Sequence, residues 1–290
     1  MSKRTNQGGH ASGAQARKKF KVSSGFLDPG TAGIYATCIR RKEKQATQEL
    51  KLLLEEKLQE YYGDELNATN DDPKEHTEGE TVDEEEELSV EDQLKKELEE
   101  MKKQDKPATK EEKKKTILQF IDLSCECVVF CKIRKPVEPE KFVERIIGEL
   151  ADPENKVKRT RYVQKLTPIT YSCSASRDQL TKLIGQVIAP HFHDPKGKKD
   201  YKFAVEVSRR NFNTIPRMDI IDGIVSQVTK QGAYGHKVDL KNYDKLILVE
   251  CFKNNIGMSV VNGSYTSKYR KYNIQKIFED KFPNEDKKDP

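Results

Sequence analysis

Residues 201–252 read YKFAVEVSRRNFNTIPRMDIIDGIVSQVTKQGAYGHKVDLKNYDKLILVECF, and their pattern of apolar residues is the strongest indication of the fold. Phe203, Val205 and Val207 alternate with other residues, which predicts a strand over 201–208. The elements expected after it are a helix over 215–229 and strands over 237–240 and 245–252. This order predicts a mixed α/β unit.

The tetrad Arg209-Arg210-Asn211-Phe212 follows the predicted strand. Two guanidinium groups can form hydrogen-bonded forks on phosphates, and a neighbouring aromatic ring can stack on a base. An arginine pair after an edge strand can also serve only to keep a domain soluble, and for the pair alone we favour that interpretation. The whole order of strand, Arg-Arg, helix and strand favours RNA contact instead.

The remaining segments give a similar mixture of elements. Alternating and helical spacing predict the following order: a strand over 33–39, a helix to Tyr61, strands within 117–132, a helix over 139–150, a strand-like run over 162–174, a helix after Ser176 that Pro190 stops, a strand over 258–261 and a last helix over 274–282. Pro168 indicates an edge strand or a break. A charged helix is also conceivable over 88–103.

Charge is distributed very unevenly along the 290 residues. The chain is 35% charged and 34% hydrophobic, and its net charge is only +5. Residues 62–100 alone carry a net charge of −14, whereas residues 1–21 carry six basic residues and no acid. The remainder therefore carries +13, which favours nucleic acid as a partner because binding releases counterions from phosphates. No run of about 18 apolar residues is present, and no amphipathic stretch favours a membrane surface.

Basic and aromatic residues are interleaved over 156–215, where the net charge is +9. This mixture suits RNA that is single-stranded or recognised at an end, although a solvated surface over core tyrosines is the plainer alternative. The candidate RNA-binding residues are Lys158, Arg159, Arg161, Tyr162, Lys165, Lys202, Arg209, Arg210, Asn211 and Phe212.

Six cysteines occur, and three of them follow the pattern Cys125-x-Cys127-x-x-x-Cys131. Structural zinc sites prefer pairs spaced two to four apart with a matching second pair. Residues 125, 127, 129, 131 and 133 would instead share one face of a strand, so we expect these thiols to pack as small hydrophobic groups and no metal to bind.

The sequence shows no catalytic motif. It has neither the phosphate loop of ATP-binding proteins nor a dinucleotide-binding glycine turn. An acetyl-CoA-binding pattern is nearly matched at Arg145–Gly148, but Leu150 occupies its last position and the site lies inside a predicted helix. We therefore expect no cofactor and no catalysis by the chain itself.

Longer runs of residues resemble a known family. The order of strand, Arg-Arg, helix, Lys237–Asp244 and strand closely resembles the second half of a THUMP domain, an RNA-binding module of tRNA-modifying proteins. From Arg17 to Tyr272 the chain resembles the THUMP-domain proteins required for tRNA cytidine acetylation. The runs that carry this resemblance are RKKFKVSSGFLDPG (17–30), GIYATC (33–38), KRTRYVQKLTPI (158–169) and KYRKY (268–272).

The pattern and the resemblance together imply a domain order. We expect a basic disordered tail over 1–24, a ferredoxin-like domain over 25–155 with an acidic low-complexity insert over about 62–115, a THUMP RNA-binding domain over 156–263 and a C-terminal extension over 264–290.

The resemblance implies a non-catalytic adaptor that binds serine and leucine tRNAs. A separate, helicase-fused RNA cytidine acetyltransferase would then form N4-acetylcytidine in the D-arm. A self-sufficient RNA acetyltransferase and an rRNA-processing RNA binder are the alternatives. We expect neither a membrane nor DNA as a partner. The basic N-terminal residues suit the nucleus, and within it the nucleolus, with the cytoplasm as the alternative.

Overall fold

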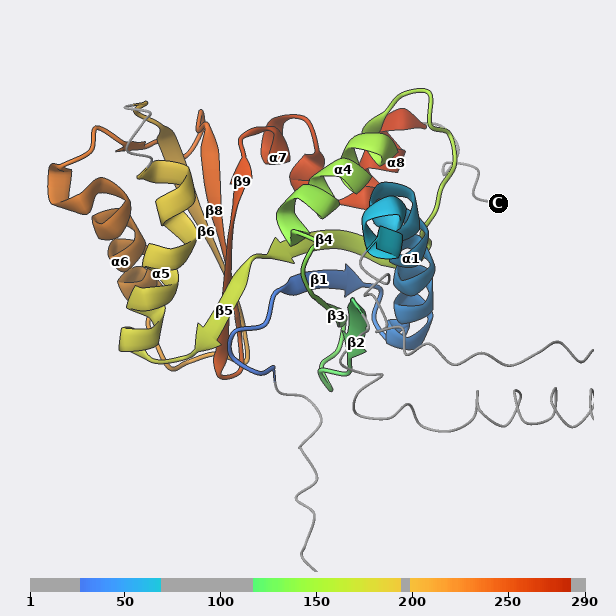
Figure 1. Cartoon of the computed structure of the whole chain (residues 1–290), viewed down its shortest axis with the longest axis horizontal. Coiled ribbons are helices and arrows are strands. Elements are labelled where there is room, and N and C mark those ends of the chain that lie inside the picture. Colours follow the sequence, from blue (N-terminus) through green and yellow to red (C-terminus); the bar gives the residue numbers. More distant parts are fainter. Residues whose placement is uncertain (1–26, 69–116, 194–198, 283–290) are drawn as a thin grey trace, which may run out of the picture.

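The computed structural model describes residues 27–68, 117–193 and 199–282. They form a mixed α/β structure with two sheets (Figure 1). The predicted tail over 1–24, the conceivable helix over 88–103 and most of the predicted acidic insert lie outside the described residues. None of the described helices combines the length and the apolar character needed to cross a bilayer.

The N-terminal sheet has four strands in the order β2-β3-β1-β4, and every neighbouring pair is antiparallel. Along the chain its elements are β1 (Gly33–Cys38), α1 (Glu43–Ala68), β2 (Leu118–Ile121), β3 (Val128–Ile133), α4 (Pro139–Ala151) and β4 (Val163–Ile169). The helix α1 continues past residue 62, where the sequence analysis began the insert.

Alternation along β1 separates two faces of this sheet. Ile34, Ala36 and Cys38 belong to the core that includes α1 and α4, whereas Tyr35 packs on the opposite face. In α1, Leu50 and Leu54 are spaced for one helical face and are fully buried. The spacing of the apolar residues therefore determines which face of β1 and which face of α1 is buried.

The strand β4 lies in the N-terminal sheet, where its backbone pairs with β1. This segment was predicted to belong to the second domain, because residue spacing cannot reveal which strand becomes its neighbour. Pro168 lies opposite Ile34 on β4, which is an edge strand. That position suits a residue without a backbone N–H.

The C-terminal sheet has five strands in the order β5-β9-β8-β6-β7. Its elements are β5 (Tyr171–Ser174), α5 (Arg177–Phe192), β6 (Lys202–Arg210), α6 (Arg217–Thr229), η1 (Lys230–Gly232), β7 (Lys237–Val238), β8 (Lys245–Phe252) and β9 (Asn255–Asn262). The helices α5 and α6 cover one face (Figure 1). The helix α5 begins as expected, since the Ser176 hydroxyl accepts a hydrogen bond from the backbone N–H of Gln179 at 3.3 Å.

Two elements are longer than predicted. The helix α5 continues through Pro190 to Phe192, because a proline in the last turn removes one hydrogen bond without ending the helix, and His193 N–H still donates to Ala189 O at 3.0 Å. The strand β6 continues to Arg210, since its backbone keeps pairing with β8 up to Phe252.

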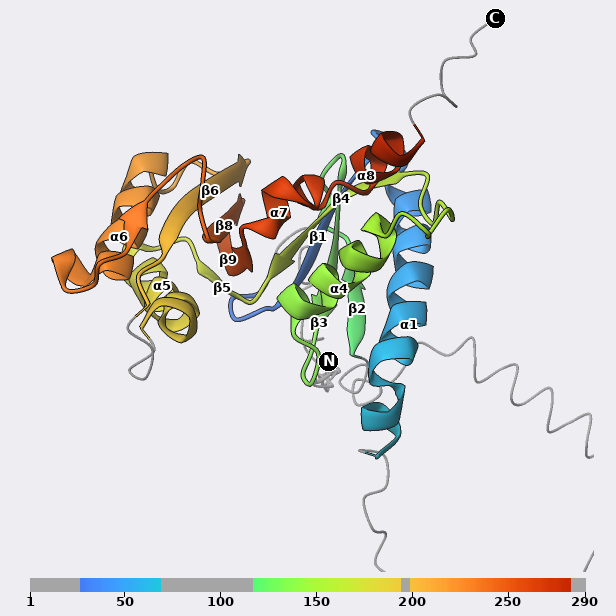
Figure 2. The same ribbon diagram turned by 90° about the horizontal axis from the view of Figure 1, so that it is seen from above.

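The terminal segment Ser264–Lys281 packs in part on the other face of the C-terminal sheet and in part on α4 and β4. It contains α7 (Ser264–Ser267), η2 (Arg270–Tyr272) and α8 (Ile274–Lys281). Tyr265, Tyr272 and Ile274 are fully buried in one core together with residues of α1 and α4. Figure 2 shows α8 beside α4 and β4. The two sheets and the terminal segment therefore share a continuous hydrophobic core.

Close backbone approach joins the two sheets where β4 meets β9. A Cβ atom at Gly257 would lie 2.8 Å from the Ile169 side chain, which would have to shift to accept a larger residue. The Ser259 hydroxyl donates to Pro168 O at 2.7 Å. These contacts and the shared core fix the positions of the two sheets relative to each other.

Candidate nucleic-acid interface

The basic segment before β4, residues 158–162, is anchored to α1. The Glu49 carboxylate accepts hydrogen bonds from the backbone N–H groups of Arg161, Tyr162 and Val163 at 3.0, 2.8 and 3.2 Å. One side chain thus holds three consecutive amides, while the side chains of Lys158, Arg159 and Arg161 face solvent. The segment is preorganised rather than a loose loop.

Its side chains differ in their partners. Lys158, Arg159 and Arg161 are exposed and Tyr162 is half-buried. Arg159 pairs with Glu56 at 3.1 Å, and the Arg161 guanidinium lies 5.5 Å from the centre of the Tyr162 ring. In the part of the chain that the structure describes, Lys158 and Arg161 form no ion pair, so they are available to an anionic partner.

The two arginines at the end of β6 point to opposite faces of the sheet, as consecutive strand residues must. Arg209 is exposed opposite Cys251, on the face that α5 and α6 cover. Arg210 is half-buried opposite Phe252, on the face toward the N-terminal sheet. They cannot form two parallel forks on one phosphate group.

Phe212 does not present its ring to solvent. It is 3% exposed and lies in the core with α5 and α6, so the expected stacking on a base is wrong for this side chain. Asn211 is exposed and has a φ of 52°, a left-handed conformation that asparagine tolerates well. The chain turns at Asn211 and returns Phe212 to the core.

Lys202 lies at the opposite end of β6 from Arg210, about 26 Å away for a nine-residue strand. Its ammonium group pairs with Asp239 at 3.2 Å, and its backbone N–H donates to Asp244 at 2.9 Å. The structure therefore does not bring Lys202 together with the other candidate residues.

Lys165, Glu206 and Lys271 form ion pairs where β4, β6 and η2 approach one another, and Glu250 of β8 and Arg210 of β6 lie near enough to influence one another's charge. We refer to them as the inter-sheet charge cluster: Lys165, Glu206, Arg210, Glu250 and Lys271. Lys271 Nζ lies 2.8 Å from Glu206 Oε2, and Lys165 Nζ lies 3.8 Å from Glu206 Oε1. One carboxylate is thus held between two ammonium groups.

The second carboxylate of the cluster is more enclosed. Burial raises the pKa of Glu250, while the Ser208 hydroxyl, Lys165 and Arg210 act in the opposite direction. Glu206 adds to the upward shift by charge repulsion. Lys165 and Arg210, which are distant in sequence, therefore both act on the charge of Glu250.

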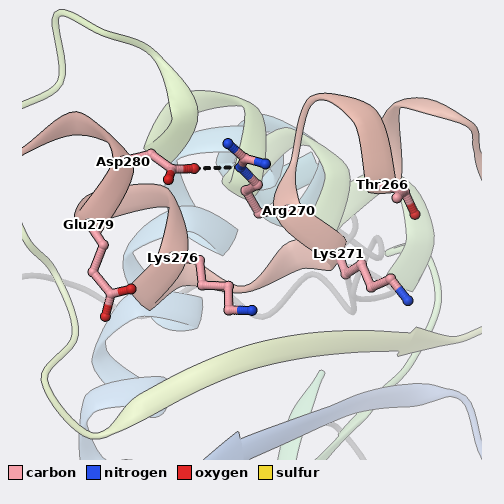
Figure 3. Close-up of a pocket in the computed structure, with 6 residues that line it drawn as sticks. All are labelled: Thr266, Arg270, Lys271, Lys276, Glu279 and Asp280. Carbon is pink, nitrogen blue, oxygen red and sulfur yellow. Dashed lines mark hydrogen bonds and ion pairs between the residues drawn. The ribbon is translucent and has the colours of Figure 1, made fainter. Parts of the chain in front are cut away.

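Lys271 and Arg270 were missed as site residues, because the terminal segment was expected only to dock as a helix. The signal was present in Lys268-Tyr269-Arg270-Lys271-Tyr272, which alternates basic and aromatic residues as the segment before β4 does. A cavity of about 460 Å³ opens beside them, lined by Thr266, Arg270, Lys271, Lys276, Glu279 and Asp280 (Figure 3).

The cysteines lie in structural positions. Cys131 faces the helix side of the N-terminal sheet, and burial raises its pKa to about 12. Cys125 and Cys127 precede β3 instead of lying along it, so the single strand face predicted for the three thiols is wrong. Among the described residues, no group of three or more histidine, cysteine or acidic side chains could hold a metal ion.

The near match to an acetyl-CoA-binding pattern lies inside α4. Ile146 and Ile147 of this stretch are fully buried in the core. A regular helix has no free backbone N–H groups in its interior, so this stretch cannot cradle a pyrophosphate.

Comparison with protein families identifies the second unit. The family model described as "THUMP domain" matches residues 174–261, which run from the end of β5 to the end of β9. The protein therefore contains a THUMP domain, built on the five-stranded sheet.

The similarity to known proteins covers the whole chain. This chain is 61% identical over 293 residues to the protein named tRNA acetyltransferase TAN1 of Saccharomyces cerevisiae, and the match covers 99% of both chains. An uncharacterized protein of Schizosaccharomyces pombe is 31% identical over 93% of this chain and 86% of its own. THUMP domain-containing protein 1 of Bos taurus is 30% identical over 93% of this chain and 70% of its own. The chain belongs to the THUMP-domain tRNA acetylation family that includes TAN1.

Proposed function

We propose that the chain is a tRNA-binding adaptor in tRNA acetylation. In this proposal it binds serine and leucine tRNAs and enables a separate, helicase-fused RNA cytidine acetyltransferase to form N4-acetylcytidine in the D-arm. It would act in the nucleus. The name of the Saccharomyces cerevisiae relative and the THUMP domain support tRNA acetylation as the process.

The inter-sheet charge cluster is the observation that carries RNA binding. Lys165 and Lys271 pair with Glu206, and Lys165 and Arg210 act against the raised pKa of Glu250, so cations from three segments of the chain surround this region. The basic segment before β4 leads directly into the strand that carries Lys165. Cationic groups arranged along a surface suit a phosphate backbone, whose binding releases counterions.

The N-terminal unit supports the same proposal. Its order β1-α1-β2-β3-α4-β4, with two helices on one face of an antiparallel sheet, fits a ferredoxin-like domain. Because this unit shares its core with the THUMP domain, the two would present one rigid surface to tRNA. A rigid surface suits an adaptor that positions a substrate for another enzyme.

One feature favours an adaptor over an acetyltransferase. The stretch closest to an acetyl-CoA pattern, Arg145–Gly148, lies inside α4 with Ile146 and Ile147 in the core. Its backbone N–H groups are used within the helix and cannot bind a pyrophosphate.

Reconstitution tests the proposal. The purified chain would be incubated with acetyl-CoA, ATP and serine tRNA, with and without the partner acetyltransferase, and N4-acetylcytidine measured by mass spectrometry. Product that forms only when both proteins are present supports the adaptor. Product formed by the chain alone would show that it is a self-sufficient acetyltransferase.

Crosslinking in cells separates the remaining alternative. RNA bound to the tagged chain would be recovered and sequenced. Serine and leucine tRNAs should dominate. If rRNA dominates instead, the chain is an rRNA-processing protein and the tRNA proposal fails.

A further inference from the structure

The backbone of the terminal segment is unusual at three consecutive residues. Arg270, Lys271 and Tyr272 have φ angles of 48°, 58° and 57°. Residues with a Cβ atom disfavour this left-handed region, and a run of three is unusual because such residues normally occur singly. Strain of this kind persists only where the surrounding structure imposes it, and it is concentrated at functional sites.

Buried tyrosines impose the turn. Tyr272 and Tyr265 are both fully buried, and their ring centres lie 4.7 Å apart in an edge-on arrangement. Tyr272 N–H donates to Tyr269 O at 2.7 Å, and Asn273 forms an isolated bridge to Lys165 of β4. The turn is therefore fixed on one side by the core and on the other by β4.

The turn directs Lys271 outward while its neighbour Tyr272 enters the core. Lys271 reaches Glu206 at 2.8 Å and remains half exposed, and Lys165 approaches the other oxygen of the same carboxylate. Two ammonium groups around one small anionic group is also the arrangement that would hold a phosphate. Glu206 thus occupies the position of an anion between two lysines.

We propose that Lys271 and Lys165 form a phosphate-binding subsite for the RNA backbone, and that Glu206 occupies this subsite until RNA displaces it. This inference rests on the proposed tRNA binding and extends it to the terminal segment, which lies outside the residues matched by the THUMP model. The strained turn positions Lys271 for this contact.

The adjacent cavity gives the subsite an open approach. In Figure 3 the Arg270 side chain is turned toward Asp280, with which it is paired, whereas Lys271 and Lys276 extend away from that pair. The cavity of about 460 Å³ that these residues line is open to solvent beside the subsite. An RNA strand can therefore reach Lys271 without a rearrangement of the core.

A glycine substitution separates strain from function. Lys271→Gly removes the ammonium group and relieves the left-handed backbone, so the melting temperature should stay the same or rise. Serine tRNA affinity, measured by fluorescence anisotropy, should fall roughly three- to tenfold, and the slope of log affinity against log salt should become shallower by about 0.7–0.9. A purely structural turn would change neither binding quantity.

The chain offers a closely matched control. Lys230 also has a left-handed φ, 41°, at the end of α6, and its ammonium group lies over the Tyr234 ring in a different part of the molecule. Lys230→Gly makes the same change of side chain, charge and backbone freedom, and should leave tRNA affinity unchanged within about twofold. Equal losses in both variants would show a general charge effect and overturn the subsite.

Glu206→Gln provides a test that does not depend on Lys271. Removing the competing charge should raise tRNA affinity about threefold or more, while a fall in affinity would contradict the displaced-carboxylate proposal. If inorganic phosphate stabilises the wild type through Lys271 while tRNA affinity is unchanged in Lys271→Gly, the subsite holds a free ion and the proposal is wrong. If the wild type itself fails to bind tRNA, the proposed function is rejected.

Discussion

The segment before β4 and the segment at the end of β6 were predicted from the same pattern of basic and aromatic residues, but the fold treats them differently. Before β4, Glu49 fixes three backbone amides and leaves Lys158 and Arg161 exposed. At the end of β6, pleating separates Arg209 from Arg210, and Phe212 enters the core. A basic-aromatic pattern therefore identifies a surface only when the local backbone turns its basic members outward together.

The largest expected effect concerns Phe212. Phe212→Ala should lower the free energy of unfolding by about 3–5 kcal/mol, because it removes a buried ring from the core. Urea unfolding measures this change, and Asn213→Ala, at an exposed neighbour, is the control. If Phe212→Ala left stability intact and weakened tRNA binding, Phe212 would be a binding residue and not a core residue.

Glu49 tests the other segment. Glu49→Ala leaves three backbone N–H groups without their acceptor and should cost about 1–3 kcal/mol of stability. Although the change removes a negative charge, tRNA affinity should fall, because the segment loses its anchor.

Glu55→Ala is the matched control for this prediction. Its carboxylate pairs only weakly with Lys51 at 3.8 Å on the exposed side of α1. This variant should retain its stability and bind tRNA at least as well as the wild type. If Glu49→Ala and Glu55→Ala bind tRNA equally well, the anchor does not organise the interface.

Separate substitutions of the two arginines test whether both contribute to tRNA binding. Arg210→Ala should weaken tRNA binding about tenfold, whereas Arg209→Ala should weaken it no more than about threefold, since only Arg210 lies in the inter-sheet charge cluster. Arg210→Lys should restore affinity only in part, because an ammonium group cannot form a bidentate fork. Equal losses for the two alanine variants would mean that RNA contacts both faces of the sheet.

The smallest expected effect is a pH dependence from Glu250. Burial raises the pKa of its carboxyl group above the ordinary value of 4.5, so the folded state holds the proton more tightly than the unfolded state does. Its contribution to stability is therefore full below about pH 4.5 and is lost as the pH rises through the folded pKa.

Glu250→Gln removes this titration. The unfolding free energy of the wild type minus that of Glu250→Gln, measured at a series of pH values, should decrease from pH 4.5 upward. Combining the measurement with Arg210→Ala should extend the decrease to higher pH, since the guanidinium opposes the shift. A difference that grows with pH would show that Glu250 is stabilised as a carboxylate.

Periodicity predicted most elements of the fold but not their partners. Alternation at Phe203 and Val207 identified β6, and the apolar stripe of Val143, Ile146 and Ile147 identified α4. The neighbour of β4 was not predictable, because strand pairing depends on long-range packing that no local pattern encodes. A proline near a helix end was also a weaker stop signal than expected.

The candidate site was predictable only in part. The basic residues before β4 were identified from local composition, and Lys165 and Arg210 do act on a common group. The contribution of Lys271 depends on a contact with Glu206 that spans 65 residues of sequence and on a left-handed turn without glycine. Neither property can be deduced from the type of residue alone.

The core shared by the N-terminal helices and the terminal segment also determines when the chain can fold during synthesis. The helices α1 and α4 leave the ribosome more than one hundred residues before Ile274, yet their apolar faces are completed by Tyr265, Tyr272 and Ile274. Until α8 emerges and Lys281 donates to the carbonyl groups of Leu150 and Asn155, the part of α4 that contacts α8 stays exposed to water and to other nascent chains. The shared core is therefore complete only once α8 has been translated.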